Sequence, residues 1–261
     1  MIIKFFRLVK NKVFYILEIF DLLIVSFELF IIKRKELRII RPIIVKQIAF
    51  TGAYGLRIIS IISIFIGIII LLLVETISKN IVFDKNLLGT IMSNIVLEEI
   101  GPLLTAIIVI GRSATAIAAE IANMNVNNEI SALETLGIDP IHFLVVPRVI
   151  GMTISMFFLV IYFFFISAIG GFIFSKAIFE LRLTTDEYID IIFKEMDVIT
   201  VVFAILKSIF FGVFISVIAC YKGMNVEKSI NFVPVAITQT VVASLIAVMF
   251  LSLYFTILLV I

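Results

Sequence analysis

The chain contains a stretch from Val149 to Ser175 without a single charged residue. An α-helix of about 20 apolar residues is long enough to cross the hydrocarbon core of a bilayer. Four other segments have a similar character: about Leu56 to Val74, Leu87 to Met124, Val198 to Cys220 and Ile230 to Ile261. The sequence is 62% hydrophobic and 15% charged, more apolar than a soluble fold of this length can bury. We therefore expect an all-α integral membrane protein with about five transmembrane helices.

The distribution of basic residues predicts the orientation of these spans. About half of all Lys and Arg residues lie at or before Lys46, which places the N-terminal side in the cytoplasm. Asn80–Asn86 and Glu180–Asp197 then become outer connections, and Asn125–Arg148 and Tyr221–Lys228 become inner ones. Five spans put the C-terminus outside.

The segment before the first span is apolar but carries a polar stripe. On a helical wheel, six charged residues fall within roughly a third of the circumference: Lys4, Arg7, Lys10, Glu18, Asp21 and Glu28. This pattern is typical of a helix lying in the membrane interface, although a poorly hydrophobic first span is the alternative. We divide the chain into residues 1–46, the N-terminal interfacial helix and basic segment, and residues 47–261, the transmembrane domain.

Several classes of function lack the residues they need. A net charge of +2 gives no indication of a nucleic-acid partner. One cysteine, Cys220, excludes an internal disulfide, and the single histidine, His142, cannot form a metal site by itself. The chain also lacks a Walker A motif. If the protein performs work driven by ATP, the nucleotide chemistry belongs to another chain.

The second apolar segment contains charges where hydrocarbon is expected: Glu98, Glu99, Arg112 and Glu120. A charge at the centre of a bilayer costs about 2.5–3.5 kcal/mol on insertion scales, so each needs a partner or water. Glu99 and Arg112 are about 20 Å apart along an ideal helix and cannot pair directly. Lys207, within the fourth span, is a candidate partner for Glu98 or Glu99. The alternative is that both glutamates are solvated at the outer interface.

Small residues and a proline shape the same segment. Gly101, Ala106, Gly111, Ala114, Ala118 and Ala122 make a thin helix that another backbone can approach closely. Pro102 removes one backbone donor, which is tolerated where a neighbour satisfies the freed carbonyl. We expect this helix at the centre of an assembly rather than facing lipid.

The connection after this segment contains a predicted short helix, NNEISALETLG. Asn127 or Asn128 is the expected N-cap, and Gly137 the expected stop. Ile130, Leu133 and Leu136 form one apolar edge. A short acidic, amphipathic helix on the cytoplasmic side is typical of a docking element for a partner protein. A helix packed on its own membrane domain is the alternative.

The region from Glu98 to Arg148 resembles the signature region of MlaE-like (YrbE-like) permeases, the membrane subunits of ABC transporters that move phospholipids or related lipids between membranes. The matching positions are Glu99, Gly101, Pro102, Gly111, Arg112, Ala119, Glu120, Met124, Ala132, Glu134, Asp139, Pro140, Pro147 and Arg148. Further similarity extends from about Lys46 to the end of the chain.

The resemblance implies a homodimeric permease without catalytic residues or a cofactor of its own. ATP and Mg²⁺ would bind a cytoplasmic ATPase dimer, and a periplasmic MCE-type protein would exchange lipid with the permease. The implied lipid path or dimer seam comprises Glu98, Glu99, Gly101, Pro102, Gly111, Arg112, Glu120 and Lys207. The implied ATPase coupling helix comprises Asn128, Glu129, Ile130, Ala132, Leu133, Glu134 and Leu136. The implied location is a bacterial inner membrane, with the plastid inner envelope as alternative.

The sequence also departs from the family pattern. Glu98 stands where the family usually has Arg, and Ser252 where Asp is common. These differences concern lipid specificity and charge pairing rather than the fold. Two other functions remain to be compared: a passive scaffold or channel without an ATPase, and a membrane-embedded lipid enzyme. The enzyme would use Glu98, Glu99 and His142, which the expected topology places on opposite sides of the membrane.

Overall fold

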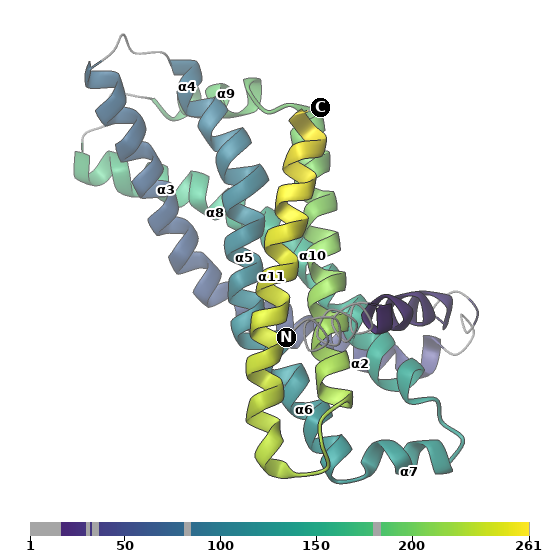
Figure 1. Ribbon diagram of the computed structural model, residues 1–261. Coiled ribbons are helices and arrows are strands. Elements are labelled where there is room, and N and C mark those ends of the chain that lie inside the picture. Colours follow the sequence, from purple (N-terminus) through teal and green to yellow (C-terminus); the bar gives the residue numbers. More distant parts are fainter. Residues whose placement is uncertain (1–16, 30–31, 33–36, 81–84, 180–183, 261) are drawn as a thin grey trace, which may run out of the picture. The chain divides into compact units, whose positions relative to one another are not determined.

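A computed structural model describes residues 17–29, 32, 37–80, 85–179 and 184–260. Within these ranges every regular element is helical, which confirms the predicted all-α class (Figure 1). Among the described residues, five helices are long and apolar enough to cross a membrane, as expected: Ile40–Val74, Leu88–Val126, Ile141–Phe174, Val198–Met224 and Ile230–Leu259.

In the first three of these spans, π-helical turns interrupt the α-helix. The first contains α2 (Leu37–Ile48) and α3 (Tyr54–Asn80), and the second α5 (Gly101–Val109) and α6 (Thr115–Val126). α8 (Val146–Phe179), α10 (Val198–Met224) and α11 (Val233–Val260) form most of the others. The π-helical turns cover Ala49–Ala53, Ile91–Ile100, Ile110–Ala114 and Ile141–Val145.

The first and third spans begin earlier than the sequence suggested. The first helix is continuous from Ile40 instead of starting near Leu56, and the third starts at Ile141 instead of Val149. Arg41, Lys46 and Arg57 are exposed on the first of these helices. These charged side chains interrupt the apolar pattern without ending the helix, because their long side chains extend away from it.

Two short helices, α4 (Lys85–Thr90) and α9 (Thr185–Lys194), pack against each other. The sequence analysis treated the α9 region only as an acidic outer stretch. Its helix starts with a capping box, in which the Thr184 side chain accepts from the Glu187 amide and the Glu187 carboxylate accepts from the Thr184 amide. Tyr188 anchors α9 by donating from its hydroxyl to the Ala168 carbonyl at 3.0 Å. Burial raises the pKa of Tyr188.

Internal contacts divide the chain into two units, which we describe separately. The first comprises Met1–Ile48, Ile110–Met152 and Val213–Leu245. The second comprises Ala49–Val109, Thr153–Gly212 and Ile246–Ile261.

In the first unit, the helix of residues 17–29 packs against α10. Phe20 meets Phe214 edge to face, with ring centroids 6.0 Å apart, and the Tyr221 hydroxyl donates to Glu18. Glu18, Asp21 and Glu28 are all exposed, in agreement with part of the predicted polar stripe. The stripe's basic members Lys4, Arg7 and Lys10 lie outside the described residues.

In the second unit, glycines allow α3 and α8 to cross backbone to backbone. A Cβ atom added at Gly67 would lie 2.0 Å from the Ser167 carbonyl oxygen, and one at Gly171 would lie 2.6 Å from the Gly67 carbonyl carbon. Any larger residue at Gly67 must therefore separate the two helices.

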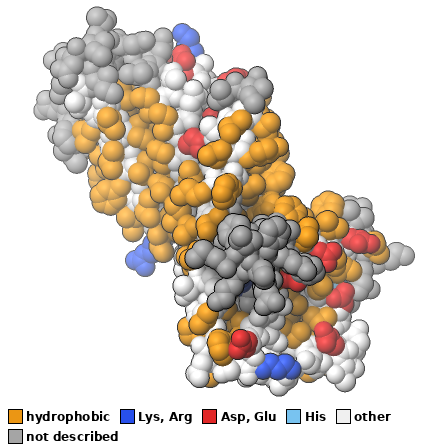
Figure 2. Space-filling model, in the orientation of Figure 1, with side chains coloured by type: hydrophobic (Ala, Val, Ile, Leu, Met, Phe, Trp, Pro, Cys, Tyr) orange, Lys and Arg blue, Asp and Glu red, His pale blue; other side chains and the backbone are white. Residues whose placement is uncertain are grey.

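Apolar side chains cover the outside of the long helices. On α3 they recur every three or four residues: Ile58, Ile61, Phe65, Ile69 and Leu73 are all exposed. Figure 2 shows hydrophobic side chains spread widely over the visible face of the molecule. An apolar surface of this extent is typical of a protein whose solvent is lipid.

Candidate functional site

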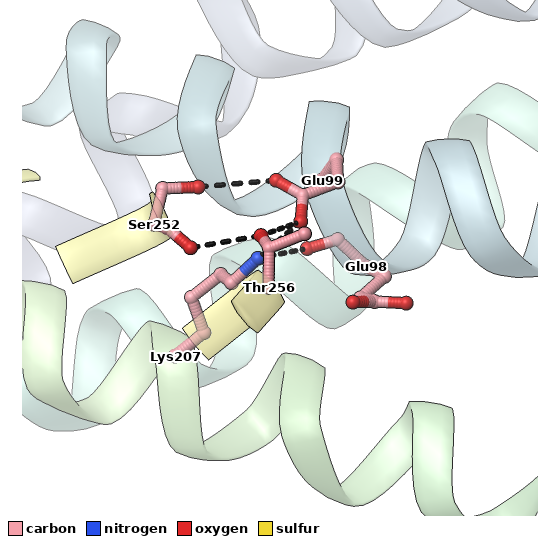
Figure 3. Close-up of polar contacts among 5 residues, drawn as sticks. All are labelled: Glu98, Glu99, Lys207, Ser252 and Thr256. Carbon is pink, nitrogen blue, oxygen red and sulfur yellow. Dashed lines mark hydrogen bonds and ion pairs between the residues drawn. The ribbon is translucent and has the colours of Figure 1, made fainter. Parts of the chain in front are cut away.

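An ion pair inside the second unit connects two transmembrane helices. The Lys207 ammonium group on α10 lies 2.7 Å from Oε1 of Glu99, on the π-helical segment Ile91–Ile100 (Figure 3). The Lys207 side chain is fully buried, and the Glu99 side chain is 29% exposed. The prediction that Lys207 pairs with one of the two glutamates is therefore confirmed for Glu99.

Lys207 also satisfies the backbone group that a proline leaves open. In an α-helix the amide of residue 102 would donate to the carbonyl of residue 98, but Pro102 has no N–H. Lys207 Nζ donates to the Glu98 carbonyl at 3.2 Å instead. The expected neighbour for the freed carbonyl is thus a buried lysine, and one side chain stabilises both a carboxylate and a helix distortion.

The last span completes the surroundings of Glu99. Ser252 Oγ donates to Oε2 of Glu99 at 3.0 Å, and Thr256 Oγ1 donates to Oε1. Both hydroxyls lie one turn apart on α11, and Figure 3 shows them facing the carboxylate. Glu99 therefore joins three elements of the second unit through charge-assisted hydrogen bonds. We call Glu99, Lys207, Ser252 and Thr256 the Glu99 cluster.

Glu98 occupies a different environment from its neighbour. The residue is 5% exposed, and Figure 3 shows its carboxylate turned away from Lys207. Its main contribution to the cluster is the backbone carbonyl described above. Next to it, Gly101 is required by packing, because a Cβ there would lie 2.7 Å from the Val96 carbonyl oxygen.

The predicted small-residue run lies inside the chain. Ala114, Ala118 and Ala122 are all fully buried. Within the first unit, α6 packs closely on the end of α10, because a Cβ at Gly223 would lie 2.7 Å from Cβ of Ile121 and 3.0 Å from the Ala118 carbonyl oxygen. The run therefore brings α6 and α10 together within one chain, consistent with the expectation that this helix does not face lipid.

Three other residues of the same span are not buried. Gly111 is exposed, with space around the position that a Cβ would take. Arg112 is half-buried, and Glu120 has a 61% exposed side chain. Glu120 Oε2 lies 2.9 Å from Nη2 of Arg148, a buried arginine that also donates to the Leu144 carbonyl at 2.7 Å. This ion pair joins α6 to the start of α8.

The predicted short helix is α7 (Glu129–Thr135). Asn128 is its N-cap, as expected, but not through a side-chain bond to the helix. Its backbone is left-handed, with φ of 59°, which asparagine tolerates better than most residues. Gly137, also left-handed, ends the helix as predicted: its amide donates to the Glu134 carbonyl, and that of Ile138 to the Leu133 carbonyl.

α7 contacts its own chain through one end of its apolar edge. Ile130 is buried and Leu133 is half-buried, but Leu136 is 75% exposed. The acidic residues Glu129 and Glu134 and the small residue Ala132 are exposed as well. The alternative of a helix packed on its own membrane domain is therefore confirmed for Ile130, while docking of a partner on the exposed acidic face stays a prediction.

Sequence reasoning missed several members of these arrangements. Ser252 and Thr256 were not singled out as partners, although their spacing of four residues on an apolar span was a usable signal. The Glu120–Arg148 pair was not anticipated either. Its residues are far apart in sequence, and a single sequence does not show which spans are neighbours.

Five apolar helices, an ion pair buried among three transmembrane elements and a short exposed helix between two spans define a multi-pass membrane protein. Comparison with known proteins gives the family. The model of the permease MlaE family matches residues 44–258, so the chain belongs to this family and is a permease of the ABC transporter class. This confirms the resemblance seen in the sequence.

Individual relatives agree with this assignment. A protein of Rickettsia typhi named "Probable ABC transporter permease protein" is 34% identical over 207 residues, which cover 79% of each chain. The protein TRIGALACTOSYLDIACYLGLYCEROL 1, chloroplastic, of Arabidopsis thaliana is 30% identical over 161 residues, 62% of this chain and 45% of its own. The intermembrane phospholipid transport system permease protein MlaE of Haemophilus influenzae is 26% identical over 230 residues, covering 87% of this chain and 86% of its own.

Proposed function

We propose that this permease moves phospholipids or related lipids between membranes, driven by ATP hydrolysis on a separate cytoplasmic chain. The name of the Haemophilus influenzae relative, an intermembrane phospholipid transport system permease protein, supports phospholipid as the substrate. Membership of the ABC transporter class supports the ATPase, to which ATP and Mg²⁺ would bind. A second copy of the chain and a periplasmic MCE-type protein complete the proposed assembly in a bacterial inner membrane. The chloroplastic relative keeps a plastid inner envelope as alternative.

The single observation that carries the proposal in this chain is the exposed face of α7. This face presents Leu136, which is 75% exposed, together with the exposed side chains of Glu129 and Glu134. A cytoplasmic partner that covers this face would bury the leucine and pair with the acids. We propose Asn128, Glu129, Ala132, Glu134 and Leu136 as the contact residues, with Ile130 and Leu133 holding α7 to the chain.

The Glu99 cluster is the proposed latch on the lipid path. Glu99 and Thr256 are the partly exposed members of the cluster, so a lipid headgroup can compete for the hydroxyl donors of Glu99 while the buried Lys207 remains in place. Breaking the bonds from Ser252 and Thr256 would release α11 from Glu99. Arg112 is the proposed second headgroup contact, with the exposed residues Gly111 and Glu120 on the same span, and Gly101 and Pro102 are proposed to shape the path near the cluster.

A pull-down from gently solubilised membranes tests the partner. The tagged chain is compared with the variant Glu129→Lys/Leu136→Asp, which changes two exposed residues and leaves Ile130 intact. Asp190→Lys, an exposed charge reversal on α9, is the matched control. We expect wild type and control to retain a nucleotide-binding chain and a phospholipid, and the α7 variant to lose the nucleotide-binding chain. Equal retention by all three would contradict the coupling role.

The alternative of a passive scaffold or channel makes a different prediction in the same experiment. No nucleotide-binding chain would be retained by any of the three proteins, while bound lipid would be unaffected by the α7 variant. A lipid enzyme receives no support from the relatives, which are named as permeases.

A further inference from the structure

The loop between α10 and α11 is joined to the end of α6 and to the start of α7 by three hydrogen bonds. From the end of α6, the side-chain amide of Asn125 donates through Nδ2 to the Met224 carbonyl at 2.7 Å and to the Val226 carbonyl at 3.0 Å. From the loop, Lys228 Nζ donates to Oδ1 of Asn128 at 3.0 Å. All these residues belong to the first unit.

The Asn125 contact satisfies backbone groups that the helix cannot satisfy itself. The last carbonyls of an α-helix have no donor within the helix, and Met224 is the final residue of α10. Asn125 therefore acts as a cap that α6 supplies to α10. Next to Met224, Gly223 lies directly against α6, because Ile121 and the Ala118 carbonyl leave no room for a Cβ there. Ile121 lies one turn before Asn125 on α6.

The Asn128 contact uses a residue whose conformation is unusual. Asn128 begins α7 in the left-handed region, and its side chain is directed to Lys228 instead of to the amides of α7. A side-chain cap is the ordinary task of asparagine at this position. Here Asn128 instead connects the start of α7 to the loop between α10 and α11.

We infer that α6, α7 and the loop Asn225–Ser229 move as one body, and that Asn125, Asn128 and Lys228 are the positioning residues that join them. This inference rests on the proposed function, because it assigns the path along which a displacement of α7 by the ATPase reaches the rest of the chain. The loop leads directly into α11 (Val233–Val260). A force on α7 is therefore delivered to the base of α11 as well as to α8, which follows α7 in the sequence.

A distance measurement on the full chain tests the joint without any partner. Cys220 is the single cysteine and is fully buried, so Cys220→Ala gives a background for spin labels at the exposed positions Ser131 and Glu227. We expect a narrow distance distribution in this background and a broad one after Asn128→Gly or Lys228→Met. Glycine keeps the left-handed backbone and removes only the side chain. An unchanged width in both variants would overturn the inference.

Lys222→Met is the matched control for this measurement. Lys222 Nζ, near the end of α10, donates to Oε1 of Gln239 on α11 at 3.2 Å. Like the bond from Lys228 to Asn128, this bond joins a lysine to a side-chain amide oxygen, but it does not involve α7. We expect its distance distribution to match that of the background. Broadening in the control equal to that in Lys228→Met would show a general loosening of α10 and would also overturn the inference.

The reconstituted complex with its ATPase supplies the functional test. We expect Asn128→Gly and Lys228→Met each to lower the lipid moved per ATP hydrolysed by roughly two- to threefold, the effect of losing one solvent-exposed hydrogen bond. The double variant should be no worse than Asn128→Gly alone, because Lys228→Met then has no bond left to remove, whereas Asn128→Gly also loses a proposed ATPase contact. Unchanged lipid movement per ATP in the single variants would refute the joint. Failure of wild type to bind an ATPase would refute the proposed function instead and leave the distance test standing.

Discussion

Replacing Lys207 by Met tests whether the Glu99 cluster holds the second unit together. Methionine matches the length and flexibility of the lysine side chain but carries no charge. The change leaves Glu99 with its two hydroxyl donors and without a counter-ion, and leaves the Glu98 carbonyl without the donor that replaces the missing amide of residue 102. The structure therefore predicts a loss of stability from two distinct groups.

The magnitude follows from the burial of the two partners. Removing one member of a fully buried pair costs about 3–5 kcal/mol, because the other charge is left uncompensated. Lys207 is fully buried but Glu99 is 29% exposed, so we expect a value near the lower end, about 3 kcal/mol. The double variant Glu99→Gln/Lys207→Met removes both charges but still leaves the Glu98 carbonyl without a donor, so its loss should fall to about 1–2 kcal/mol, below that of Lys207→Met.

Unfolding in mixed micelles with increasing SDS measures these free energies. Lys176→Met, at an exposed lysine on α8, is the control and should lie within about 0.5 kcal/mol of wild type. A Lys207→Met loss no larger than that of the control would refute the reasoning. A double variant whose loss equals the sum of the two single losses would show that the two side chains are not coupled.

Three further outcomes follow from the described residues. Burial raises the pKa of Tyr188 above its usual value of about 10, so the stability that the neutral hydroxyl contributes is fully present below about pH 10 and decreases progressively as the pH rises from there toward the raised pKa. In thermal melts between about pH 8 and pH 11, the melting temperature of wild type should fall toward the upper end of this range, and Tyr188→Phe should reduce that fall. The same dependence of melting temperature on pH in both proteins would contradict the prediction. Gly67→Ala should cost at least about 2 kcal/mol in SDS titration, because its Cβ would meet the Ser167 carbonyl at 2.0 Å, whereas Gly111→Ala should lie within about 0.5 kcal/mol of wild type. Equal losses at both glycines would contradict the described packing. Arg112→Ala should abolish lipid transfer with normal expression, and undiminished transfer would exclude Arg112 as a headgroup contact.

The number and kind of spans could be predicted from the sequence because they depend on composition over about 20 residues. The ends of the spans were less well defined. Exposed charges such as Lys46 and Arg57 interrupt the apolar pattern but not the helix, since their long side chains extend from it. α9 was missed because its signal, the capping box of Thr184 and Glu187, is short and lies in an acidic stretch.

The candidate site was predictable only where one residue stood out against its surroundings. Lys207 is a lone charge in an apolar span, and Pro102 leaves a carbonyl that needs a donor, so both pointed to a tertiary partner. Ser252 and Thr256 are common residues in transmembrane helices, and their bonds to Glu99 depend on which helices are adjacent. The same limit applies to Arg148, whose partner lies on the preceding span.

Lipid transfer between two vesicle populations tests the central claim most directly. The permease is reconstituted with the nucleotide-binding chain retained in the pull-down, and movement of labelled phospholipid to acceptor vesicles carrying the MCE-type protein is followed with ATP and with a non-hydrolysable analogue. We predict transfer that requires ATP hydrolysis and is lost in Glu129→Lys/Leu136→Asp. Transfer at the same rate with the analogue would contradict the account and favour a passive channel.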